Sequence, residues 1–223
     1  MLQDVVHDHA DPLMCSRFWV PMDERPEELL ILLNRAELAM RARQPEFHLK
    51  RGEICPGDCA AVLAPNRSRK TSLFVMRWGF RLEKRLVFNA RSETAAQKAM
   101  FSESLRFRRC LIPAASFFEW DHRQKKPAKF RFWPEGGSMM YLAGLYRFEP
   151  EASLPVFTVL TRQAEGAIAD IHDRMPVLVH AEQLDLWLNG DIDPKFILEQ
   201  PPEPLTCQSE ANSSSASPTQ LTM

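Results

Sequence analysis

Short apolar runs separated by turn residues are the feature of this sequence that most restricts its fold. The runs are rich in β-branched and aromatic residues and are shorter than most globular helices, a pattern typical of strands. Pro21 ends the first of them, as expected where an extended strand must turn. Residues 53–63 are predicted to form a turn at Pro56-Gly57 followed by a strand. The pattern predicts further strands at 15–20, 72–80, 86–90, 108–113, 116–120, 129–133, 139–147, 156–161 and 177–180.

One long helix is predicted at residues 26–43, where leucine, isoleucine and alanine recur at helical spacing. Glu27 and Glu28 stand in its first turn, where the helix dipole favours acidic side chains. Shorter helices are predicted at 95–100, from Ala164 onward and at 181–188. The strands at 129–133 and 139–147 are predicted to pair as a hairpin across Glu135-Gly136-Gly137.

The composition indicates a globular protein with reduced thiols. None of its apolar runs approaches the ~20 residues that a membrane span requires, so no membrane anchor is expected. Residues 1–14 lack the basic start and apolar middle of a secretory signal. Five cysteines, an odd number at irregular spacing, do not suggest a disulfide framework. These features predict a cytoplasmic protein.

Charge is distributed unevenly along the chain. The formal net charge is −1, but residues 67–131 carry seventeen basic side chains against five acidic ones. Such a local excess can bind a phosphate backbone whatever the total charge is. A solvated surface laced with ion pairs would give the same composition, and composition alone leaves both interpretations open.

Cys15 follows a methionine near the start of the chain. If everything before it were removed, it would carry a free α-amine beside its thiol, and that pair can close a thiazolidine ring on an aldehyde. Taken alone, an isolated cysteine is more often buried and inert. Cys55 and Cys59 would need further ligands to hold zinc, and because no second Cys/His pair with matching spacing is present, packing is expected there.

Glu119 and His172 are candidates for proton transfer. Glu119 lies within an aromatic run, Phe117-Phe118-Glu119-Trp120, and burial would raise its pKa as in a proton donor. An alternating strand would instead point it to solvent. His172 precedes an Asp-Arg pair and could titrate near neutral pH, although most lone histidines have no such role.

Seven stretches occur in a characteristic order: 14–18 (MCSRF), 77–80 (RWGF), 88–94 (FNARSET), 109–113 (RCLIP), 118–120 (FEW), 143–145 (AGL) and 171–176 (IHDRMP). Together they resemble the SOS response-associated peptidase family over residues 15–190. The resemblance implies a single α+β domain, rich in antiparallel strands that form a barrel-like sheet, with flanking helices. It also implies a protein without a cofactor or metal that binds single-stranded DNA and captures abasic sites in a covalent thiazolidine. Such a protein would be associated with the nucleoid when bound to DNA.

The resemblance also assigns roles to individual residues. Cys15 matches the catalytic cysteine, Asn89 the asparagine that positions its amine, Glu119 the neighbouring glutamate, and His172 the histidine that assists proton transfer. Arg17, Arg91 and Arg174 match phosphate-binding arginines. Arg77 and Trp78 are predicted to contact DNA too, with Trp78 stacking on unpaired bases or packing in the core.

Three segments are predicted: a leader or misassigned start at 1–13, a domain at 14–198 and a disordered tail at 199–223, rich in Pro, Ser and Thr. We expect a monomer. Besides the covalent cross-linking activity, with associated peptidase and lyase-like activity, two alternatives remain. One is a cysteine peptidase that acts on its own leader, and the other is a non-covalent binding module for single-stranded or modified DNA.

Overall fold

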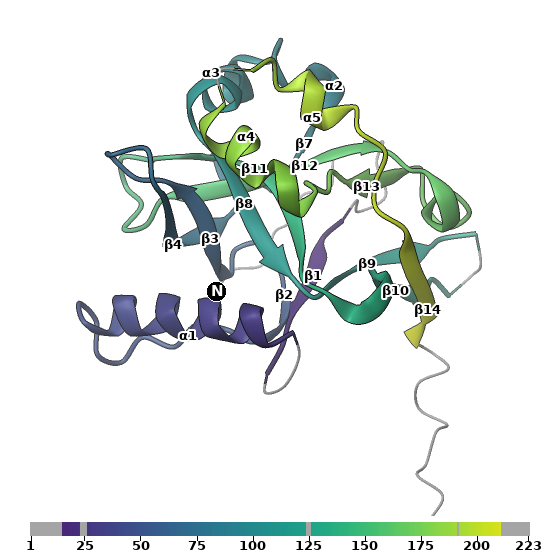
Figure 1. The fold of residues 1–223 in the computed structure, drawn as a ribbon, viewed down its shortest axis with the longest axis horizontal. Coiled ribbons are helices and arrows are strands. Elements are labelled where there is room, and N and C mark those ends of the chain that lie inside the picture. Colours follow the sequence, from purple (N-terminus) through teal and green to yellow (C-terminus); the bar gives the residue numbers. More distant parts are fainter. Residues whose placement is uncertain (1–14, 23–25, 124–125, 191, 211–223) are drawn as a thin grey trace, which may run out of the picture.

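The computed structural model describes residues 15–22, 26–123, 126–190 and 192–210. Strands from distant parts of the chain meet in two sheets (Figure 1). A separate short hairpin is formed by β5 and β6. The strands are β1 (Arg17–Val20), β2 (Gly52–Ile54), β3 (Cys59–Pro65), β4 (Thr71–Trp78), β5 (Phe80–Leu82), β6 (Arg85–Val87), β7 (Asn89–Arg91), β8 (Arg109–Ala114), β9 (Ser116–Asp121), β10 (Ala128–Pro134), β11 (Met140–Arg147), β12 (Val156–Gln163), β13 (Arg174–Pro176) and β14 (Leu205–Ser209).

The first sheet is antiparallel throughout, in the order β14-β10-β9-β1-β2. β9 lies at its centre and β1 lies next to it, with Arg17 opposite Phe118. Cys15 lies two residues before the start of β1. This register places it beside β9, the strand that carries Glu119. The first sheet therefore brings together two candidate residues that are 104 positions apart.

The second sheet runs in the order β11-β8-β3-β4-β12-β13. Because β11 also pairs with β12, its first five strands close on themselves as a barrel. β12 is parallel to β4 and to β7, whereas its pairings with β11 and β13 are antiparallel. Asn89 is the first residue of the short strand β7, and His172 lies two residues before the short strand β13. Both strands pair with β12. The predicted α+β class with antiparallel, barrel-like sheets is confirmed.

Helices flank the barrel on different sides (Figure 1). The long helix α1 lies against β3 and β4, with Leu29, Leu33 and Ala36 buried. The helices α3 and α4 contact β8, and their buried side chains share a second apolar cluster with α2 and α5. The helices are α1 (Glu27–Arg41), α2 (Ser92–Ala95), α3 (Ala99–Phe107), α4 (Leu184–Asn189) and α5 (Lys195–Leu198), with 3-10 turns at Glu135–Gly137, Gly166–Ile168 and Ala181–Gln183. No described helix is long and apolar enough to cross a membrane.

Several local predictions were wrong. The strands β10 and β11 do not pair across Gly136: β10 lies between β9 and β14, and β11 pairs with β8 and β12. The helix predicted at 95–100 is interrupted: α2 ends at Ala95, residues 96–98 form a turn, and α3 runs from Ala99 to Phe107 with the apolar Phe101 and Leu105 buried. Residues 177–180 form a single bridge at Leu178 rather than a strand, and only a 3-10 turn follows Ala164.

The predicted tail from residue 199 needs correction as well. β14 forms the edge of the first sheet and pairs with β10 from Phe130 to Pro134. Leu205 and Cys207 pack against the main core, so this segment belongs to the domain although its sequence is polar. The predicted leader at 1–13 and the remainder of the predicted tail, 211–223, lie outside the described residues.

We predict that β14 contributes to stability. A chain ending at Pro204 loses the ladder with β10 and uncovers the core beneath Leu205 and Cys207. Its free energy of unfolding should be lower by about 2 to 4 kcal/mol than that of a chain ending at Glu210. Urea unfolding of the two truncated chains measures this difference. Equal midpoints and slopes would mean that residues 205–210 do not belong to the folded unit.

Candidate functional site

The site is centred on Cys15, which precedes β1 and is fully buried. Its backbone nitrogen donates a hydrogen bond of 2.7 Å to Oε1 of Glu119. Its φ is 23°, a value that residues with a β-carbon seldom adopt because the β-carbon crowds the neighbouring carbonyl groups. The backbone at Cys15 is therefore held in an unfavourable conformation next to an ionisable group.

Glu119 is buried within β9, where five of the six residues are buried. The alternation that would point it to solvent fails because both faces of β9 are covered: Phe117 and Phe118, whose side chains point to opposite faces, are also buried. Burial, with a smaller contribution from the charge on Asp173, raises the pKa of Glu119 to about 8, although the hydrogen bond from Cys15 partly opposes both effects. At neutral pH the side chain is therefore mainly a carboxylic acid.

The two oxygens of Glu119 have different partners. Oε1 accepts the Cys15 N–H, so in the protonated form the proton resides on Oε2. Oε2 is buried and has no hydrogen-bond partner within the described ranges. A buried O–H group without a partner is unfavourable by itself, and this one is free to donate to another molecule.

The Cys15 thiol is not activated in this form of the chain. Burial raises its pKa well above the ordinary value, and the neighbouring Glu119 adds to the effect. The thiol therefore remains protonated at neutral pH. For Cys15 to act as a nucleophile, a nearby group has to accept its proton.

Asn89 approaches Cys15 from the second sheet: on β7, it donates from Nδ2 to the Cys15 carbonyl oxygen at 3.3 Å. His172 is buried just before β13, and its Nδ1 lies 3.0 Å from the Arg174 backbone nitrogen and 3.1 Å from Oδ1 of Asp173. In the tautomer whose Nδ1 accepts the Arg174 N–H, the proton is on Nε2, which is buried without a partner in the described part of the chain. Cys15 thus contacts Glu119 and Asn89 directly, whereas His172 adjoins the Asp173 that perturbs Glu119.

Three of the predicted DNA-binding arginines lie at least partly at the surface. Arg17 is one-third exposed and pairs with Glu53. Arg77 is exposed and donates to the Gly57 carbonyl oxygen at 3.2 Å. Arg91 is also exposed, at the end of β7. Each of these guanidinium groups can be reached by a ligand from solvent.

Arg174 and Trp78, which are also predicted to contact DNA, are both buried. The Arg174 guanidinium makes two hydrogen bonds, of 2.6 and 2.8 Å, with Glu93. Trp78 is fully buried, stacks on Phe157 and donates from its indole nitrogen to the Phe88 carbonyl oxygen. It therefore packs in the core and does not stack on unpaired bases.

Several residues around the site were not singled out from the sequence. Glu93 and Asp173 stand inside recognised motifs, and their contacts with Arg174 and His172 could have been suspected from that placement. Glu53 and Lys129 gave no such signal, because their contact joins β2 to β10 across 76 positions. Among the described residues, no group of three or more His, Cys, Asp or Glu side chains is arranged to hold a metal ion.

The sequence profile described as SOS response associated peptidase (SRAP) matches residues 14–211. The chain belongs to this family. Abasic site processing protein YoqW of Bacillus subtilis is 35% identical over 118 residues, which are 50% of this chain and 52% of that protein. The matched part of this chain thus spans about half the length of that relative. Abasic site processing protein YedK of Escherichia coli is 28% identical over 187 residues, 82% of each chain.

Solved structures agree with the SRAP fold. A protein from Bordetella bronchiseptica superposes with a TM-score of 0.66 at 24% identity, over 87% of this chain and 99% of that chain. A protein from Bacteroides thetaiotaomicron gives a TM-score of 0.69 at 17% identity. At these identities the likeness concerns the fold alone.

The raised pKa of Glu119 predicts how stability depends on pH. The folded chain holds this proton more tightly than the unfolded chain, whose carboxyl titrates near 4.5. The stabilisation is therefore complete below about pH 4.5 and is lost as the pH rises to about 8, by a few kcal/mol at most. Thermal unfolding of full-length protein between pH 5 and 8.5 should reveal this decline.

A Glu119→Gln variant should lack this part of the decline, because the amide keeps an acceptor for Cys15 but does not titrate. Glu182→Gln, at an exposed glutamate, serves as the matched control and should follow the unaltered chain. If Glu119→Gln and the unaltered chain lose stability in parallel, Glu119 does not titrate with a raised pKa.

Proposed function

We propose that this chain processes abasic sites in single-stranded DNA by forming a covalent thiazolidine cross-link through Cys15. The contact between the Cys15 nitrogen and the protonated Glu119 carries the proposal, because it places an acid at the nitrogen that would react. The names of the relatives YoqW and YedK support abasic-site processing in general. The covalent mechanism rests on the chemistry of the site.

The reaction needs Cys15 to be the first residue. Its nitrogen then changes from an amide, which is not nucleophilic, to an amine with a pKa of about 8, an appreciable part of which is neutral at physiological pH. A chain that begins at Cys15 has no preceding carbonyl, so the strain associated with the φ of 23° disappears. Removal of the preceding residues is therefore favoured by the backbone conformation at this position.

The chemical steps balance without any cofactor. The Cys15 amine adds to the C1′ aldehyde of a ring-opened abasic deoxyribose, and the resulting carbinolamine loses one water to give an imine. The thiolate then attacks the imine carbon, forming a C–S bond while the nitrogen takes up a proton. The product is a thiazolidine whose mass equals that of protein plus DNA less one water.

The neighbouring residues have roles suited to these steps. Glu119, as an acid, can protonate the departing hydroxyl of the carbinolamine and afterwards accept the thiol proton. Asn89 holds the Cys15 carbonyl and so orients the residue without adding charge. The Nε2–H of His172 can donate to the sugar ring oxygen as the ring opens.

DNA is expected to contact the exposed or partly exposed Arg17, Arg77 and Arg91. Guanidinium groups bind phosphate oxygens in a forked geometry, and the local excess of basic residues makes the association sensitive to salt. A flexible single strand suits a buried nucleophile, since a base-paired sugar would be held inside its duplex.

A second candidate function is supported by the same contact. Glu119 is hydrogen-bonded to the nitrogen that would leave if the Met14–Cys15 peptide bond were broken, and the strained φ favours that break. We therefore also propose that the chain cleaves its own leader. An acid at the leaving nitrogen is what amide hydrolysis requires.

The proposals are tested by intact-mass spectrometry of full-length protein, before and after incubation with a single-stranded oligonucleotide containing one abasic site. We expect a gain of the oligonucleotide's mass less one water, confined to molecules that begin at Cys15. Cys15→Ser should abolish this gain while DNA binding remains, because serine lacks the thiol that closes the ring. Cys59→Ser, at a half-buried cysteine, is the control and should cross-link normally.

The same samples, kept without DNA, test self-cleavage. Molecules that begin at Cys15 should accumulate with time in the unaltered chain and should not accumulate in Glu119→Gln. Unmodified molecules that begin at Cys15 and remain so with abasic DNA would contradict covalent capture. Binding without any mass change would then indicate a non-covalent module.

A further inference from the structure

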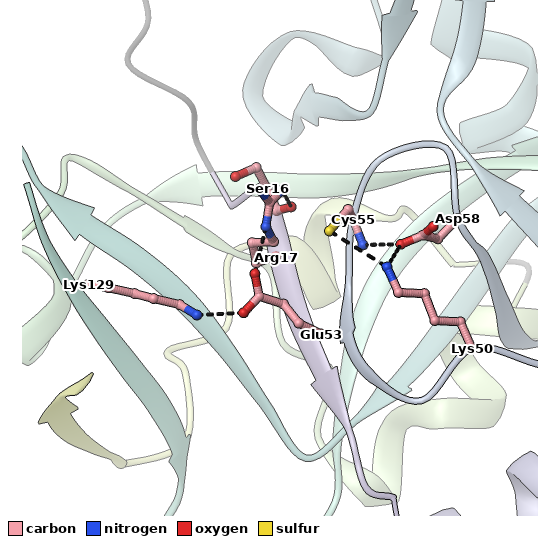
Figure 2. A network of polar contacts seen from close by, with 7 residues as sticks. All are labelled: Ser16, Arg17, Lys50, Glu53, Cys55, Asp58 and Lys129. Atoms are coloured by element: carbon pink, nitrogen blue, oxygen red, sulfur yellow. Dashed lines mark hydrogen bonds and ion pairs between the residues drawn. The ribbon is translucent and has the colours of Figure 1, made fainter. Parts of the chain in front are cut away.

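A charged cluster lies beside the candidate site, on the outward part of the first sheet. Figure 2 shows Arg17 and Lys129 reaching the Glu53 carboxylate from different strands. Arg17 Nε donates to Oε1 at 2.7 Å, and Lys129 Nζ donates to Oε2 at 2.5 Å. One carboxylate therefore bridges two cations with its two oxygens, and the cluster keeps a net positive charge.

The two cations are held in place independently of Glu53. The Lys129 ammonium lies 3.9 Å from the centre of the Phe118 ring and 5.7 Å from that of Trp120. Arg17 also donates to the Ser16 carbonyl oxygen at 3.2 Å. Cation–π and backbone contacts of this kind would keep both groups near their positions after the carboxylate moved away.

The cluster is joined to the reacting residues through Arg17, the first residue of β1, which is two positions after Cys15. Lys129 is paired with Trp120 across β9 and β10. Because Trp120 directly follows Glu119, the side chains of Lys129 and Glu119 lie on opposite faces of this sheet. Arg131, two residues further along β10 and so on the same face, lies 5.3 Å from the Trp19 ring and extends the row of cations. A DNA strand whose sugar reached Cys15 would pass its neighbouring phosphates over this row.

We propose that Arg17 and Lys129 form a subsite for a phosphodiester group next to the abasic sugar, and that Glu53 occupies this subsite until DNA displaces it. The inference rests on the proposed function, of which it specifies the binding step. A phosphodiester, like a carboxylate, offers two oxygens that share one negative charge, so it can replace Glu53 between the same two donors.

The physical state of Glu53 fits such an exchange. Burial by itself would raise its pKa, but hydrogen bonds from Lys129 and Arg17 outweigh this effect and hold the pKa below the usual value. Glu53 is thus ionised at neutral pH and competes directly with phosphate. All three side chains are about one-quarter to one-third exposed, and ion pairs with this exposure contribute little net stability. Glu53 therefore reduces non-productive binding without closing the subsite.

The test measures the affinity of full-length protein for a fluorescent, undamaged single-stranded oligonucleotide by anisotropy at several salt concentrations. Glu53→Gln should bind about 3- to 10-fold more tightly, because the competitor has lost its charge. Lys129→Gln should bind more weakly and reduce the slope of log affinity against log salt by about 0.7, the value for one phosphate contact. In the double variant the gain from Glu53→Gln should largely disappear.

A matched control separates the subsite from a general effect of charge. Glu103→Gln removes the same charge from an ion pair with Arg108 at the end of α3 and should leave affinity within about 2-fold. An equal gain in Glu103→Gln, or no gain in Glu53→Gln, overturns the proposal. If thermal unfolding shows that Glu53→Gln does not fold, Lys129→Gln decides, and an unchanged salt slope overturns the proposal.

Failure of the subsite is distinguishable from failure of the proposed function. If the unaltered chain cross-links to abasic DNA while both variants bind like it, the subsite is wrong and the function stands. If the variants change affinity as expected but no chain cross-links, the subsite is supported for single-strand binding and the covalent function is wrong.

Discussion

The hydrogen bond between the Cys15 nitrogen and a buried, protonated Glu119 is the interaction on which the rest of the site depends. It exists because β1 and β9 are neighbours in one antiparallel sheet, with a register that sets Arg17 opposite Phe118. The barrel then contributes Asn89 and His172 through β12, which holds both short strands that bear or adjoin them. The two sheets thus meet at Cys15, where Glu119 contacts the nitrogen and Asn89 the carbonyl oxygen, and burial keeps the acid protonated at neutral pH.

Local sequence patterns were enough to locate most strands and the long helix, because apolar spacing is a short-range property. They were not enough to determine which strands pair. β10 and β11 flank a glycine pair, and this arrangement suggested a hairpin. Instead, β10 pairs with β9 and β14, and β11 pairs with β8 and β12. Closure of the barrel depends on the parallel pairing of β12 with β4, in which Val156 lies opposite Arg77 although the two residues are far apart in the sequence. β14 was missed because an edge strand with polar residues looks like a tail.

The site illustrates the same limit. Alternation along β9 left Glu119 either buried or exposed, and the fold decides for burial because it covers both faces of this strand. Arginine and tryptophan side chains often contact nucleic acids, but Arg174 forms an ion pair with Glu93 and Trp78 is buried in the core. No local pattern could predict the ion pair between Glu53 on β2 and Lys129 on β10. The resemblance named reacting residues, whereas their protonation and exposure required the fold.

The most direct test of this account is the pKa of Glu119 itself. Carbon-13 NMR of glutamate side-chain carboxyls, with Glu119→Gln to assign the signal, follows its titration in the folded full-length chain. The account predicts a carboxyl resonance that titrates near pH 8. A signal that titrates near 4.5, the value of an ordinary glutamate, would mean that the group beside the Cys15 nitrogen is a carboxylate at neutral pH. It would remove the acid on which both proposed reactions rely.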